Sequence, residues 1–143
     1  MILVDANILL YAYDASSTRH EAARGWLEEA LGGDEEIRFA LITLLAFVRL
    51  STNPSLFRNP LRSDEAIEIV IAWLEQPVVG LADPTDLHWS RLAEVARVGQ
   101  AHGPLLMDAH LAALAIEHGA TLCTTDRDFA RFRGLRFRDP LGP

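Results

Sequence analysis

The sequence predicts an α/β fold in which a parallel sheet of five strands is covered by helices on both faces, in one domain over residues 1–143. Two observations predict this three-layer α/β/α arrangement. Short apolar runs alternate along the chain with longer helical patterns, which is the order that a parallel sheet with crossover helices requires. The apolar runs are also continuous, as is typical of strands that are buried on both faces.

The five expected strands lie at residues 1–4, 37–42, 78–82, 121–124 and 135–138. The first expected helix begins at a capping box formed by Thr18 and Glu21 and ends at Gly32 and Gly33. Further helices fit the ranges 43–52, 64–76, 86–101 and 107–118. The stretch 53–63 contains two prolines and no clear period, so we expect a loop there.

Composition places the chain among globular proteins. Half of its 143 residues are apolar, which suits one domain with a single sizeable core. No run approaches the roughly 18 apolar residues of a membrane span, and the N-terminus lacks the basic segment of a signal peptide. We therefore expect a cytoplasmic protein with no membrane partner. The lone Cys123 lies in an apolar strand, where a reduced, buried thiol is expected.

The charge pattern restricts the possible chemistry. The net charge of -7 argues against nucleic acid as a partner, since phosphate binding normally uses a positive surface. All 13 basic residues are Arg, however, and Arg is the better bidentate ligand for phosphate. Five of them crowd the C-terminal segment, in a cluster typical of a solvated surface but also able to hold phosphates: Arg127, Arg131, Arg133, Arg136 and Arg138. The absence of Lys excludes a P-loop.

Three aspartates stand at the ends of predicted elements. Asp5 follows the strand MILV, Asp126 follows the strand in TLCTT, and Asp108 opens the helical run DAHLAALAIEHG. The carboxyl ends of parallel strands border one crevice, and a right-handed crossover starts the helix of Asp108 near the same edge. Each acid alone is explained as a helix cap or first-turn acid. Because all three acids are expected at the same edge, the sequence predicts a shared site, with Asp128 close by.

Carboxylates held close together raise each other's pKa unless a cation neutralises them. Aspartates without a nearby His or Cys point to Mg²⁺, or to Mn²⁺, rather than to Zn²⁺. His110 and His118 have no second ligand at metal spacing, so we expect them to be exposed or bonded to a protein partner. The chemistry that such a site supports is metal-assisted hydrolysis of a phosphodiester.

Three segments of the chain resemble the signatures of the PIN-domain nucleases, in particular the VapC-type toxins of bacterial toxin–antitoxin systems. They are VDANILLYAYD, TLLAFVRLSTNP and DAHLAALAIEHGATLCTTDRDFARF. The resemblance covers nearly the whole chain. It implies a PIN-like fold with a five-stranded parallel sheet, Mg²⁺- or Mn²⁺-dependent endoribonuclease activity on RNA, homodimerisation, and a cognate antitoxin that blocks the site.

Matching the motifs gives roles to individual residues. The resemblance implies that Asp5, Asp108 and Asp126 are the catalytic metal carboxylates and that Asp128 is an accessory one. It also implies that Asn7, with Thr124 or Thr125, orients acids or waters. From its position one turn after Ala46, Arg49 is a candidate for contacting an RNA phosphate, with a structural ion pair as the alternative.

One departure from the family pattern bears on activity. The middle signature usually carries a Glu where this chain has Ala46, and residues 37–63 contain no acid at all. We expect Asp128 to compensate. Because of Ala46, a second hypothesis is that the chain is a catalytically weakened PIN-like module that chiefly binds RNA or a partner protein. An acidic-site phosphatase with Asp5 as nucleophile is a third hypothesis, although Asn7 stands where that family usually has Asp.

The helix expected at 64–76 is apolar over more of its circumference than a one-sided helix needs. Burial between two flanking elements explains this pattern. A surface for a second copy of the chain or for an antitoxin explains it equally well.

Overall fold

A computed structural model describes residues 1–142 and confirms the predicted fold class. All strands run parallel, in the order β3-β2-β1-β4-β5. The strands are β1 (Ile2–Val4), β2 (Ile37–Phe39), β3 (Val79–Leu81), β4 (Thr121–Cys123) and β5 (Phe137–Arg138). The helices are α1 (Ala6–Tyr13), α2 (His20–Leu31), α3 (Leu41–Ser51), α4 (Ser63–Leu74), α5 (His88–Val98) and α6 (Leu105–Glu117), and a 3₁₀ helix η1 (Arg127–Arg131) follows β4.

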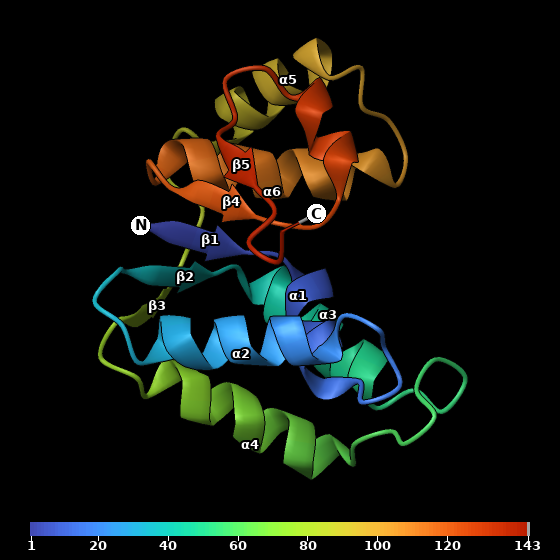
Figure 1. The fold of residues 1–143 in the computed structure, drawn as a ribbon. Coiled ribbons are helices and arrows are strands. Elements are labelled where there is room, and N and C mark those ends of the chain that lie inside the picture. The colour runs from blue at the N-terminus through green and yellow to red at the C-terminus, as the bar shows by residue number, and fades with distance from the viewer. Residues whose placement is uncertain (143) are drawn as a thin grey trace.

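The central strand β1 shows why the strand sequences are continuously apolar. Side chains alternate between the two faces of a strand. Ile2 and Val4 pack on one face with residues of α1 to α4, whereas Leu3 packs on the other with residues of α5 and α6. Both faces are therefore core. Figure 1 shows α5 and α6 beside β4 and β5, with α2 and α4 at the opposite end of the molecule.

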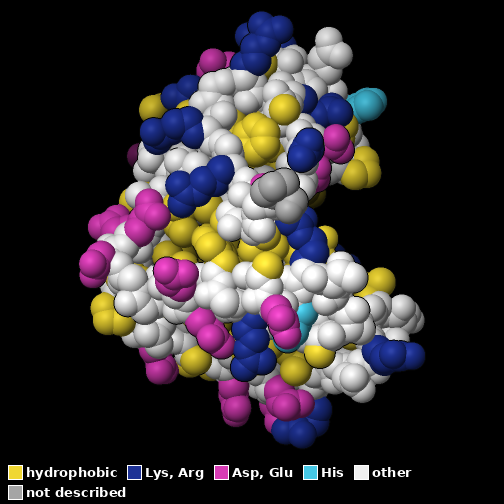
Figure 2. Space-filling view, viewed as in Figure 1, with side chains coloured by type: hydrophobic (Ala, Val, Ile, Leu, Met, Phe, Trp, Pro, Cys, Tyr) yellow, Lys and Arg dark blue, Asp and Glu magenta, His cyan; other side chains and the backbone are white. Residues whose placement is uncertain are grey.

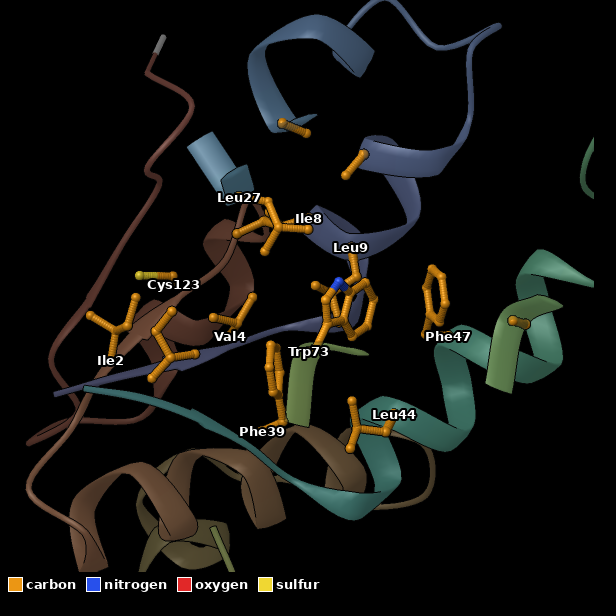
Figure 3. Close-up of a cluster of buried hydrophobic side chains, with 14 residues drawn as sticks. Ile2, Val4, Ile8, Leu9, Leu27, Phe39, Leu44, Phe47, Trp73 and Cys123 are labelled. Carbon is orange, nitrogen blue, oxygen red and sulfur yellow. The ribbon is translucent and has the colours of Figure 1, made fainter. Parts of the chain in front are cut away.

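The core cluster that contains Ile2 and Val4 is aromatic at its centre. Trp73 of α4 stacks on Phe39 of β2, with ring centroids 5.6 Å apart, and it contacts Phe47 of α3 at 4.8 Å and Tyr13 of α1 at 5.9 Å. Figure 3 shows Phe39, Phe47 and Trp73 beside the aliphatic side chains of the same cluster. This packing fixes α1 and α3 against the sheet, and both helices border the candidate site. Cys123 is a buried free thiol in this cluster, as predicted.

Several predicted boundaries are corrected. The capping box at Thr18 and Glu21 is wrong: α2 begins at His20 after Arg19, without a side-chain cap. The Arg19 N–H instead bonds the hydroxyl of Ser17 at 3.1 Å, which leaves Thr18 in a turn. Helix α6 begins at Leu105 rather than 107, so Asp108 lies within its first turn. Helices α1 and η1 were not among the predicted elements.

Two further observations concern the chain as a whole. Among residues 1–142, no helix is long and apolar enough to cross a membrane. The strand arrows of Figure 1 point to one edge of the sheet, and Figure 2 shows the molecule hollowed on that side. This carboxyl edge is where the predicted aspartates lie.

Candidate active site

Asp5 is held where β1 passes into α1. Its backbone N–H donates to the Cys123 carbonyl of β4 at 2.9 Å, which ties the carboxyl ends of the two central strands together. Its Oδ1 accepts the N–H of Ala6 at 2.7 Å, so the side chain caps α1. Burial raises the pKa of Asp5, against the hydrogen bonds from Thr124 and Ala6, and the charge of Asp126 raises it further.

Thr124 connects the aspartates. Its buried hydroxyl donates to Asp5 Oδ2 at 2.7 Å and accepts the N–H of Asp126 at 3.0 Å. It also accepts Asn7 Nδ2 at 3.3 Å. Because the hydroxyl proton is directed to Asp5, its lone pairs receive the other two donors. The same network directs Asn7 Oδ1 elsewhere, and this buried oxygen has no partner among the described residues.

Asp126 and Asp128 lie at the start of η1. Asp126 is its N-cap, and its Oδ1 accepts the N–H of Asp128 at 2.8 Å. Asp126 is partly buried, whereas Asp128 is exposed. Capping therefore does explain part of what Asp126 does. Capping does not explain why the other acidic side chains lie in the same region as Asp126.

Asp108 shows that the four acids share one region. Burial raises the pKa of Asp108, and the next causes are the charges of Asp126, Asp5 and Asp128, with Arg131 opposing them. Residues more than 100 positions apart in the chain thus act on one carboxyl group. Repulsion between neighbouring carboxylates is what a bound cation relieves.

A cavity of about 580 Å³ adjoins two of these acids. Asp5 and Asp108 line it together with the apolar side of α3 and with Arg49. Ala46 also lines it, so the position at which the resemblance leads us to expect a Glu borders the same cavity as Asp5 and Asp108. The guanidinium group of the exposed Arg49 is the basic group on this cavity wall.

Thr125 is separated from this arrangement. It lines a second cavity, with Arg127 and the C-terminal segment, rather than the cavity of Asp5 and Asp108. Of the two threonines that the motif offered, Thr124 is the one bonded to the aspartates. The alternation of side chains along an extended segment accounts for the difference.

A buried polar network between α5 and α6 was not anticipated from the sequence. His88 Nδ1 donates to Glu117 Oε2 at 2.6 Å, and His88 Nε2 lies 2.8 Å from His110 Nδ1. The Thr85 N–H and hydroxyl both donate to Glu117 Oε1, at 3.1 and 2.7 Å. His110 is thus bonded to a protein partner, as predicted. The only sequence signal was three polar residues on otherwise apolar helix faces.

The donors at the carboxyl edge suit a hard cation. Within residues 1–142, no group of three or more His, Cys, Asp or Glu side chains is arranged so that it could hold a metal ion as it stands. Mg²⁺ commonly takes only one or two protein carboxylates and keeps several waters, so an open set of aspartates is compatible with it. All the donors here are oxygens, which argues against Zn²⁺. The fold and the site together define a three-layer α/β/α domain with an acidic crevice at the carboxyl edge of its sheet.

The chain belongs to the PIN-domain family, whose model matches residues 2–135. It is 44% identical over 140 residues to Ribonuclease VapC37 of Mycobacterium tuberculosis, which covers 98% of this chain and 97% of that protein. This match over nearly the whole length extends the resemblance seen in the three motifs to the full fold.

Solved structures agree on the fold. A toxin–antitoxin complex from Klebsiella pneumoniae superposes with a TM-score of 0.68 at 19% identity, covering 100% of both chains. VapC20 of Mycobacterium tuberculosis, described as a sarcin–ricin loop cleaving toxin, superposes with a TM-score of 0.66 at 19% identity, covering 95% of this chain and 99% of that one. At this identity the likeness concerns the fold alone.

Proposed function

We propose that this chain is a Mg²⁺-dependent endoribonuclease, with Mn²⁺ able to substitute, and the toxin of a type II toxin–antitoxin pair of the VapBC kind. The observation that carries the proposal is the placing of three acids in one region: Thr124 links Asp5 to Asp126, and Asp5 and Asp108 line the same cavity. The 44% identical relative is named a ribonuclease. As an RNA-cleaving toxin the chain would act in the cytoplasm, where its substrates are.

The proposed roles follow from the geometry. Asp5, Asp108 and Asp126 would hold the cation, and Asp128 would assist from the solvent side. When bound, the cation would supply positive charge to the scissile phosphate and activate water for attack. Thr124 keeps the carboxylate of Asp5 in one orientation.

Two side chains complete the proposed machinery. Asn7 donates from Nδ2 to the Thr124 hydroxyl and so supports the group that orients Asp5. Arg49 would donate to an RNA phosphate from the wall of the 580 Å³ cavity. A phosphate there would lie beside both Asp5 and Asp108.

Two apolar surfaces support the proposed protein partners, an antitoxin and a second copy of the chain. On α4, Ile67 and Ile71 are 49% and 48% exposed, although Trp73 of the same helix is buried. On α3, Leu41 and Leu45 are 58% and 57% exposed, and Leu45 also lines the cavity of the acids. A partner covering α3 would therefore close access to the site, as an antitoxin must.

Ala46 favours one alternative, a weakened module that binds RNA with little cleavage. The position faces the cavity and carries no acid. A nuclease that depends on the remaining aspartates would still cut, whereas a binding module would not.

A cleavage assay separates the two. Purified protein is incubated with total cellular RNA and Mg²⁺, next to the same protein in EDTA and to the Asp5→Asn variant. Asp86→Asn is the matched control, since Asp86 is an exposed acid in the turn before α5. We expect discrete fragments from the wild type and from Asp86→Asn alone. Equal cleavage by Asp5→Asn, or no cleavage by the wild type, would overturn the proposal.

A further inference from the structure

A second cavity, of about 360 Å³, borders the loop that carries Asp126. It is formed by the start of α2, the loop between β4 and η1, and the C-terminal segment. Its polar lining consists of Thr18, Arg19, Thr125, Arg127, Asp139 and the backbone of Gly142. Two arginines and two hydroxyl groups thus surround a hollow of a size that admits a phosphate group.

The position of this cavity relates it to the acids. Thr125, which lines it, stands between Thr124 and Asp126, both of which belong to the aspartate network. Asp5 lines the 580 Å³ cavity instead. The loop that carries Asp126 thus borders the cavity of Arg19 and Arg127, whereas Asp5 and Asp108 line the cavity of Arg49.

Arg19 is already engaged with an anion in this cavity. Its Nη2 donates to Asp139 Oδ2 at 3.2 Å and to the Gly142 carbonyl at 3.3 Å. The side chains of this pair are 33% and 36% exposed, and such partly solvated pairs contribute little to stability. The Arg19 guanidinium also lies 5.8 Å from the ring centroid of Tyr11. At this distance the ring attracts the positive charge through a cation–π interaction.

Other donors of the cavity remain available. Among the described residues, the hydrogen bonds of the Arg19 guanidinium group all use Nη2, which leaves its Nε and Nη1 donors for a ligand. Arg127 is exposed and projects from η1. Figure 2 shows basic side chains next to the C-terminal segment on this face.

We propose that the 360 Å³ cavity binds a backbone phosphate of the RNA, other than the phosphate that is cleaved. Arg19 and Arg127 donate to its oxygens, and Asp139 competes with it for Arg19. The inference rests on the proposed ribonuclease function. It gives the enzyme a substrate-positioning subsite separate from the cavity that contains Arg49.

The test is RNA binding without cleavage. A fluorescein-labelled single-stranded RNA of eight nucleotides is titrated in EDTA, and its anisotropy is followed at several salt concentrations. We expect Arg19→Gln and Arg127→Gln each to weaken binding about tenfold, because each removes a charged hydrogen bond to phosphate. The double variant should lower the slope of log affinity against log salt by about 0.7, the loss of one phosphate contact on a single strand.

Two further variants test whether weaker binding could come from the loss of any positive charge or from a damaged fold. Arg136→Gln removes the same charge from the same C-terminal segment, but Arg136 bonds the Gly119 carbonyl ahead of β4, at the opposite edge of the sheet. It should bind within about twofold of the wild type. Asp139→Asn should change affinity in the opposite direction and strengthen binding about threefold, since Arg19 loses its competing carboxylate. A damaged fold does not produce stronger binding.

The outcomes distinguish this inference from the proposed function. If Arg19→Gln and Arg127→Gln bind no more weakly than Arg136→Gln while the wild type cleaves RNA, the subsite is wrong and the nuclease stands. If the variants weaken binding but the wild type never cleaves RNA in Mg²⁺, the subsite stands and the nuclease is wrong. Unchanged affinity in Asp139→Asn would refute the competition for Arg19.

Discussion

Thr124 Oγ1 donates a 2.7 Å hydrogen bond to Asp5 Oδ2, although the two residues are 119 positions apart in the chain. The bond joins the carboxyl end of β4 to the carboxyl end of β1, next to the backbone bond between Asp5 and Cys123. The hydroxyl accepts the Asp126 N–H at the same time. One buried oxygen thus fixes two of the aspartates relative to each other.

Thr124→Val keeps the shape of the side chain and removes this oxygen. Asp5 loses a donor, and the Asp126 N–H loses its acceptor. We expect the free energy of unfolding to fall by about 1–3 kcal/mol and cleavage to fall about 10- to 100-fold, as for residues that orient metal ligands. Thermal unfolding and initial cleavage rates measure the two effects. Thr124→Ser, which keeps the hydroxyl, should retain most activity, and equal activity of the Val and Ser variants would contradict the role of the bond.

Ala46→Glu should restore an acid to the cavity wall that already carries Asp5 and Asp108. We expect Mn²⁺ to bind about tenfold more tightly, because one more carboxylate faces the ion. The metal-free protein should become less stable, since like charges are brought together. Calorimetry and thermal unfolding in EDTA check both statements. Ala46→Gln is the control of equal size; if it raises Mn²⁺ affinity as much as Glu does, the added charge is not the cause.

Glu117 contributes a pH-dependent part of stability. Burial alone would raise its pKa, but hydrogen bonds from Thr85 and His88 outweigh burial and hold the pKa below its ordinary value of 4.5. A carboxyl group with a lowered pKa stabilises the fold above that ordinary value, and this stabilisation is lost as the pH falls through the lowered pKa.

Glu117→Gln should therefore cost about 2 kcal/mol at pH 7, where the charged hydrogen bonds are complete. The difference from the wild type should shrink as the pH falls below 4.5. Urea unfolding at pH 7, 5 and 3.5 measures it. A difference that stays constant over this range would show that the charge of Glu117 does not contribute.

Gly99 ends α5 where no side chain fits. A Cβ atom there would lie 2.5 Å from Cδ1 and Cε1 of the buried Phe132 ring. Gly99→Ala should therefore destabilise the protein by about 1–3 kcal/mol through overpacking. Gly25→Ala is the matched control, because Gly25 lies within α2 with open space around it; it should stabilise by about 0.5–1 kcal/mol. Similar unfolding temperatures for the two variants would contradict this prediction.

The sheet, and the position of Asp5 and Asp126 after two of its strands, could be predicted from the sequence for a physical reason. Strands buried on both faces are continuously apolar, so Asp5 and Asp126 stood out where these runs ended. The parallel topology then places both acids at one edge, and β1 pairs directly with β4.

Other features depended on tertiary contacts that local patterns do not encode. The predicted capping box of Thr18 and Glu21 is wrong because α2 begins only at His20, after Arg19. In the turn before the helix, the Ser17 hydroxyl accepts the Arg19 N–H. The choice between Thr124 and Thr125 required knowing which of them turns toward Asp5. The network of His88 with Glu117 joins residues of two helices, and no spacing along the chain marks it.

The central claim is that the aspartates at the carboxyl edge of the sheet form one metal site. Calorimetric titration of the purified protein with Mn²⁺ tests it most directly, with Asp108→Asn and the exposed control Asp86→Asn measured alongside. We expect the wild type and Asp86→Asn to bind Mn²⁺ with equal affinity, and Asp108→Asn to bind at least about tenfold more weakly. Absence of Mn²⁺ binding by the wild type, or unchanged binding in Asp108→Asn, would contradict the claim.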